Sequence, residues 1–179
     1  MFRTTTLLAF TLLLIAGIVS APQSPAAGRD SKRIKPQVFL EYNKLLAGGK
    51  CRVVMEIQVE KGWHINANPA MPSTQIATEF TVKSTQGVKL TNVKYPKYHV
   101  IEMPGVGNVN VYDGKIQISG VLEIPASAAG KVDDLKLEVR YQACDDRSCE
   151  PPQTATIQGK IPVTSQAGEL KKTNLQYFE

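Results

Sequence analysis

The chain has 179 residues, of which 42% are hydrophobic and 21% are charged. This composition predicts a folded globular domain, because disordered chains are less hydrophobic and collagen-like chains repeat glycine with a fixed period. The formal net charge of +5 comes from isolated Lys and Arg residues rather than a dense basic run, which argues against a nucleic-acid partner.

The amino-terminal residues 1–21 have the pattern of a secretory signal peptide. Arg3 precedes an apolar run over residues 7–19, and small residues follow, the last of which is Ala21. The run is too short to span a bilayer comfortably. Because Pro22 is a poor residue to follow a cleavage point, a retained signal anchor is the alternative. We therefore expect an exported, soluble protein in an oxidising compartment, where disulfides persist.

Two polar segments flank the expected domain, which spans residues 37–164. Residues 22–36 are rich in Pro, Ala, Gly, Ser, Lys and Arg and offer almost nothing to bury, so we expect a flexible leader. Residues 165–179 form a polar tail, which we expect to be loose except for Tyr177 and Phe178.

Within the domain, short runs of β-branched and aromatic residues alternate with turn signals, and no stretch shows a helical period. These runs predict strands at residues 38–42, 52–59, 76–82, 88–95, 109–112, 116–124, 135–141 and 154–163. In the clearest alternation, one face of the predicted strand is mostly charged and the other is apolar. The apolar face consists of Cys51, Val53, Met55, Ile57 and Val59. The predicted fold class is all-β, a two-sheet antiparallel sandwich.

Cys144 and Cys149 enclose four residues, among which Asp and Ser favour turns, and two prolines soon follow. The pair can bond only if the segment folds back, because five extended steps span roughly 17 Å and a disulfide needs α-carbons about 4.4–6.8 Å apart. So small a ring stabilises a fold by only about 2 kcal/mol. A redox couple in a loop at a strand end and an ordinary structural disulfide both fit this spacing.

Local charge bears on how reactive this pair is. Asp145, Asp146 and Glu150 disfavour a nearby thiolate, whereas Arg147 favours one. The acidic side dominates, so the sequence predicts a dithiol that is not strongly activated.

Cys51 admits two interpretations. Trp63 follows it by twelve residues, much as the core tryptophan of an immunoglobulin domain follows the first cysteine, which suggests a bond from Cys51 to Cys144. That bond would leave Cys149 as a free thiol in an oxidising space, and Tyr141 lies three residues before Cys144 instead of two. We favour Cys51 as a small buried apolar residue on the inward face of its strand.

Two histidines raise the question of a metal, since two cysteines and two histidines can surround zinc. His64 belongs to a run over residues 62–66 that ends the strongest strand, and His99 lies in a predicted loop. Their spacing resembles no zinc module, so we expect no metal and no cofactor. The sequence also has no glycine-rich phosphate loop, serine nucleophile elbow or paired-carboxylate motif.

The segment 141–152, with the sequence YQACDDRSCEPP, resembles the active-site segment of the amino-terminal periplasmic domain of the DsbD thiol:disulfide interchange protein family. Residues 62–65 and 95–113 are similar to that domain in order and distance, so the resemblance covers roughly residues 36–163. It implies an immunoglobulin-like sandwich in the periplasm. Its loop cysteines would accept electrons from a membrane thiol carrier and reduce periplasmic thioredoxin-like proteins, including those of cytochrome c biogenesis.

The resemblance also implies roles for individual residues. Cys149 matches the thiol that attacks a partner's disulfide, and Cys144 matches the one that resolves the mixed disulfide. Trp63 and His64 fall where neighbours flank the pair, and Tyr141 opens the motif.

Related domains carry a mobile cap loop, often with an aromatic residue, that shields the disulfide. The corresponding stretch here is residues 101–110, which has no aromatic residue. Met103 and Val106 are the expected shielding residues, because a thioether or an aliphatic side chain can cover sulfur by apolar contact. Gly105 and Gly107 would let the loop open.

We expect a standalone, monomeric redox relay, because neither the transmembrane carrier nor the carboxy-terminal thioredoxin-like domain of the family occurs in this sequence. The competing hypothesis is a binding module that keeps the sandwich and holds a structural, non-cycling Cys144–Cys149 bond. A third is an immunoglobulin-like adhesion domain with the long-range bond.

Overall fold

A computed structural model describes residues 33–179, so the expected signal peptide and nearly all of the expected leader lie outside the described residues. Within 33–179 the chain is almost entirely β, with three short 3-10 turns at residues 126–128, 167–169 and 175–177. None of the helical segments in this range is long and apolar enough to cross a membrane.

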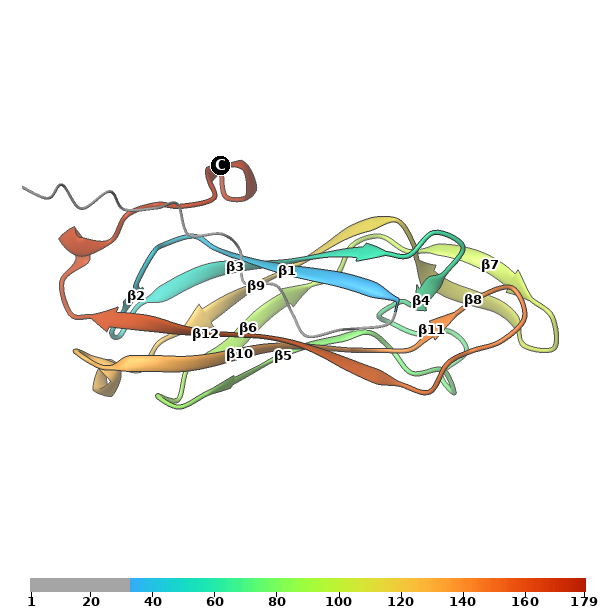
Figure 1. The fold of residues 1–179 in the computed structure, drawn as a ribbon, viewed down its shortest axis with the longest axis horizontal. Helices are drawn as coiled ribbons and strands as arrows, with labels where there is room; N and C mark the ends of the chain where they lie inside the picture. Colours follow the sequence, from blue (N-terminus) through green and yellow to red (C-terminus); the bar gives the residue numbers. More distant parts are fainter. Residues whose placement is uncertain (1–32) are drawn as a thin grey trace, which may run out of the picture.

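Two four-stranded sheets face each other along the long axis of the molecule (Figure 1). One has the order β1 (Ile34–Leu40), β3 (Lys50–Val59), β9 (Lys115–Glu123) and β6 (Lys89–Lys94). The other has the order β2 (Leu45–Leu46), β12 (Gln153–Thr164), β10 (Val132–Tyr141) and β5 (Glu79–Ser84). Neighbouring strands are antiparallel, except that β12 pairs with β2 in parallel.

The hydrophobic core lies between these sheets, where the inward side chains of both form one cluster. It includes Val53, Met55, Ile57, Ile118 and Leu122 from the first sheet and Leu137, Val139 and Ile157 from the second. The prediction of an all-β, immunoglobulin-like two-sheet antiparallel sandwich is therefore confirmed. Each of the eight predicted strands corresponds to an observed one within a few residues.

A third, smaller sheet extends one end of the sandwich, on the right in Figure 1. Its order is β11 (Ala143–Cys144), β4 (His64–Asn66), β8 (Gly107–Tyr112) and β7 (His99–Met103). Only Gln142 separates β10 from β11, so the long strand delivers Cys144 directly to this sheet. His99, expected in a loop, opens a strand instead, because residues 99–103 pair with residues 107–111 of β8.

The domain begins earlier than expected, because β1 starts at Ile34 and includes Pro36 from the predicted leader. Ile34 is 2% exposed and contributes to the core. Proline is tolerated here because β1 is at the edge of its sheet, where one side of the strand needs no backbone donor.

In the tail, Tyr177 and Phe178, the two residues excepted from the expected looseness, pack against the outer face of the first sheet. Phe178 forms a small apolar cluster with Phe39 and Val54, and the Tyr177 ring stacks on Phe39 with centroids 4.1 Å apart. The Tyr177 hydroxyl donates a hydrogen bond of 3.0 Å to Glu56. This cover explains why the outer face of β3 is buried at its centre.

Candidate functional site

Cys144 and Cys149 form a disulfide with α-carbons 4.0 Å apart. Cys144 is fully buried, whereas Cys149 is exposed. Cys51 is a free thiol, 1% exposed, on the inward face of β3. The interpretation of Cys51 as a buried apolar residue is confirmed, and the alternative bond from Cys51 to Cys144 is wrong.

The loop between the two cysteines folds back around Asp145. One of its carboxylate oxygens accepts hydrogen bonds from the backbone N–H groups of Arg147 (2.8 Å) and Ser148 (2.7 Å). These bonds favour the ionised form and lower the pKa of Asp145. The backbone N–H of Glu150 then donates to the Ala143 carbonyl at 2.8 Å. The turn chemistry of Asp145 therefore brings Cys149 beside Cys144.

Apolar side chains from the β7–β8 hairpin cover the buried sulfur. Cys144 belongs to a cluster with Met103, Val109 and Val111, against which Ile101 packs. The stretch expected to be a cap loop is thus mostly two paired strands. We define this cover of Cys144 as the apolar cap.

The two expected shielding residues behave differently. Met103 is 7% exposed within the apolar cap, whereas Val106 is 41% exposed at the tip of the hairpin. The tip is tight because Met103 pairs with Gly107, and Gly105 and Gly107 adopt φ angles of 78° and 92° that favour glycine. Met103 therefore lies where it can shield the disulfide, whereas the Val106 side chain is largely open to solvent.

His64 lies directly opposite Cys144 in the β4–β11 pair. It is 7% exposed, and its Nε2 atom has no hydrogen-bond partner. Burial lowers the pKa of His64, an effect that the negative charges of Asp146 and Asp113 oppose. His64 also lines a shallow groove that Asp146 and Val111 border.

Trp63 does not join the cluster around Cys144; it is half-buried beside the main core and carries Arg33 on its ring. The guanidinium carbon of Arg33 is 3.8 Å from the ring centroid, a cation–π contact. Arg33 Nε donates to Glu150 at 2.8 Å, and its Nη1 donates to Glu60 at 3.1 Å. Arg33 therefore anchors the residue that follows Cys149.

We expect Arg33→Ala to slow alkylation of reduced Cys149 by iodoacetamide at pH 7 about threefold to tenfold. Without the guanidinium, the Glu150 carboxylate is an uncompensated negative charge beside Cys149, and such a charge disfavours the thiolate. Mass spectrometry of timed samples gives the rate. Lys50→Ala is the control, because it breaks a comparable ion pair, with Glu123 at 2.9 Å, at the opposite end of β3. Equal rates in Arg33→Ala and the unaltered protein would contradict this role.

The remaining sequence-predicted residue, Tyr141, lies in the main core and is fully buried. Its hydroxyl donates to Gln153 at 3.2 Å. It thus supports the end of β10 and is not part of the apolar cap.

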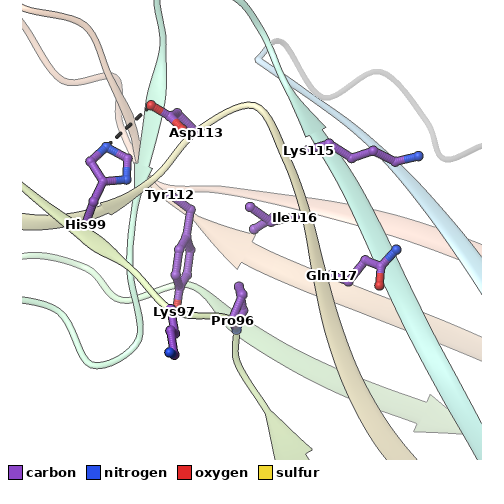
Figure 2. A pocket seen from close by; sticks show the side chains of 8 residues that line it. All are labelled: Pro96, Lys97, His99, Tyr112, Asp113, Lys115, Ile116 and Gln117. Atoms are coloured by element: carbon purple, nitrogen blue, oxygen red, sulfur yellow. Dashed lines mark ion pairs between the residues drawn. The ribbon is translucent and has the colours of Figure 1, made fainter.

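A second hollow shares His99 and Asp113 with the groove (Figure 2). In Figure 2 these two side chains point toward one another, with His99 Nε2 and Asp113 Oδ2 separated by 3.4 Å. Lys97 and Tyr112 also line this hollow, which contains no cysteine. Among residues 33–179, no group of three or more His, Cys, Asp or Glu residues could hold a metal ion.

Comparison with known proteins gives one family match. The model of the N-terminal region of the thiol:disulfide interchange protein DsbD matches residues 34–161, which include both bonded cysteines. No curated protein sequence matches the chain.

Several solved structures are similar to this chain at low identity. The N-terminal periplasmic domain of ScsB from Proteus mirabilis is 14% identical, with 75% of this chain and 51% of that one covered and a TM-score of 0.50. This chain thus spans about half of that protein. The DsbD n-terminal domain of Neisseria meningitidis in the reduced form is 15% identical over 76% of this chain and 90% of that one, with a TM-score of 0.46. A chain from a complex of the Neisseria meningitidis DsbD and PilB N-terminal domains is 17% identical over 68% of this chain and 80% of that one, with a TM-score of 0.40.

Proposed function

This chain belongs to the family of the N-terminal domain of the thiol:disulfide interchange protein DsbD, and from that membership we propose that its Cys144–Cys149 pair exchanges electrons with partner proteins. One observation carries the proposal: the bonded pair joins an exposed cysteine to a buried one at the end of the sandwich. An exposed sulfur is open to another polypeptide, and a buried one is protected from stray thiols.

The exchange has two steps. In the reduced form, the Cys149 thiolate attacks a partner's disulfide, so that a mixed disulfide forms and one partner thiolate leaves. Cys144 then loses its proton and attacks the Cys149 sulfur, which re-forms the Cys144–Cys149 bond and releases the second partner thiolate. The partner gains two electrons and two protons, and the domain loses the same number.

The proposed partners follow from the family. A membrane thiol carrier would reduce the Cys144–Cys149 bond, and a periplasmic thioredoxin-like protein would receive the electrons. The pair sits on a narrow end formed by the third sheet and the loop after Cys144, which suits docking of another domain without disturbance of the core (Figure 1).

Equilibration with glutathione tests the proposal. We expect the pair to open and close reversibly in native buffer as the ratio of reduced to oxidised glutathione changes, whereas Cys51 stays unmodified. Alkylation followed by mass spectrometry counts the thiols. Cys51 is the internal control, because burial raises its pKa to about 11 and keeps it out of reach. A pair that opens only in denaturant would instead support a non-cycling module with a structural disulfide.

A further inference from the structure

Resolution of the mixed disulfide presents a chemical difficulty at Cys144. The attacking species must be a thiolate, yet Cys144 is fully buried in the apolar cap. Burial disfavours the charged form of a thiol, and the carboxylates of Asp145 and Asp146 lie in the adjoining loop. The aliphatic and thioether side chains of the apolar cap cannot accept a proton. The buried thiol therefore needs a base close by.

The strand register supplies one. Cys144 lies between two partners, because Cys149 bridges it on one side and His64 of β4 pairs with it on the other. Directly opposed residues on antiparallel strands present their side chains on the same face, with β-carbons about 4.5–5.5 Å apart. The imidazole is thus next to the Cys144 side chain, on the side away from Cys149.

The hydrogen bonding of His64 fits this placement. Its Nε2 atom is buried and lacks a partner in the disulfide form, although buried polar groups in native proteins are almost always paired. A nitrogen without a proton can accept one hydrogen bond. Reduction of the disulfide creates an S–H group on the neighbouring strand, which gives Nε2 the donor that it lacks.

We propose that His64 is the proton acceptor for Cys144 during resolution of the mixed disulfide, an inference that rests on the proposed exchange function. Cys144 Sγ–H transfers its proton to His64 Nε2, and an electron pair of the resulting Cys144 thiolate forms the bond to Cys149 Sγ. The bond between Cys149 and the partner sulfur breaks, and the partner leaves as a thiolate that takes a proton from solvent. The imidazolium then returns its proton to solvent through the groove.

The charges around His64 are consistent with a neutral acceptor at pH 7. Burial lowers the pKa of His64 from its ordinary value of 6.5, and His99 of β7 acts in the same direction. Asp145, Asp146 and Asp113 oppose this effect. Glu60 and Lys61 complete the charged lining of the groove. The ring is therefore unprotonated when exchange begins and is stabilised by three carboxylates once it accepts a proton.

The test separates the two steps of exchange with dithiobis(nitrobenzoic acid) as the disulfide probe. In stopped-flow mixing with excess probe, the first thionitrobenzoate released reports attack by Cys149, and the second reports attack by Cys144. We expect His64→Phe to slow the second release about 100-fold at pH 7 and to leave the first within about twofold, because general bases contribute about 100-fold or more. The control is Lys50→Ala, which breaks the ion pair with Glu123 at the opposite end of β3 and should leave both releases unchanged.

The pH profile distinguishes proton transfer from a packing effect. The second release in the unaltered protein should rise to a plateau that begins below about pH 6.5, because the proton then moves within the protein. In His64→Phe it should rise about tenfold per pH unit with no such plateau, because hydroxide must remove the proton. A second release in His64→Phe within about threefold of the unaltered protein overturns the proposal.

The unaltered protein alone can also overturn the assignment of His64. If the rate of the second release in the unaltered protein climbs about tenfold per pH unit from pH 6 to 9, the assignment is overturned even when His64→Phe fails to fold. Failure of the proposed exchange function looks different, because then the reduced protein releases no thionitrobenzoate in either phase.

Discussion

A Cys144→Ala protein is expected to stop halfway through exchange, with Cys149 held in a mixed disulfide. Cys149 is exposed and its thiol remains a nucleophile, so it attacks glutathione disulfide and acquires one glutathione. No second thiol is in reach to release the adduct, because Cys51 is buried in the core. We expect nearly complete conversion to a species one glutathione heavier in the mass spectrum, whereas the reduced unaltered protein closes its own disulfide and shows no stable adduct.

The reciprocal variant, Cys149→Ala, fixes the assignment of roles. It retains only the buried Cys144 at this site, which the apolar cap separates from solvent. We expect its modification by glutathione disulfide to be at least about 100-fold slower, since exchange rates depend on thiolate fraction and access. An adduct on Cys149→Ala alone would reverse the two roles, and no adduct on either variant would show that the dithiol does not exchange.

The fold was largely predictable because its main strands are long enough to display alternation. β10 has 10 residues whose burial alternates along the whole strand, and β3, also of 10 residues, alternates at both ends while the tail covers its centre. Such alternation indicates a half-buried antiparallel strand. The strands of the third sheet were mostly missed, since β4 has three residues and β11 has two. A period of two cannot be recognised over so few residues, and these strands form through pairings between distant parts of the chain.

The candidate site was predictable only where its chemistry is local. Asp and Ser between Cys144 and Cys149 are turn formers, so the folded-back loop could be anticipated from the sequence. The contact of Arg33 with Glu150 joins residues separated by 117 positions, and no local pattern points to it. The same holds for His64: resemblance placed it near the cysteines, but only the register of β4 against β11 puts it opposite Cys144.

Outside the core, we expect the largest loss in the free energy of unfolding from a substitution in the carboxy-terminal segment. Phe178 is 8% exposed and packs against Phe39 and Val54 on the outer face of the first sheet. Its backbone carbonyl accepts a hydrogen bond of 2.6 Å from Arg52, whose guanidinium also lies 5.2 Å from the ring centroid. The aromatic ring thus holds a segment that the polar composition of residues 165–179 predicted to be mostly loose.

We expect Phe178→Ala to lower the free energy of unfolding by about 3 kcal/mol, the lower end of the range for buried phenylalanine. Such a loss is large for a domain whose stability is of the order of 5–15 kcal/mol. Denaturant unfolding followed by tryptophan fluorescence measures it. Leu175→Ala is the matched control, because Leu175 is apolar, belongs to the same segment and is 43% exposed, so its loss should cost within about 0.5 kcal/mol. Equal stability of the two variants would mean that the segment does not pack on the sheet in solution, and Val54 and Glu56 would then face water.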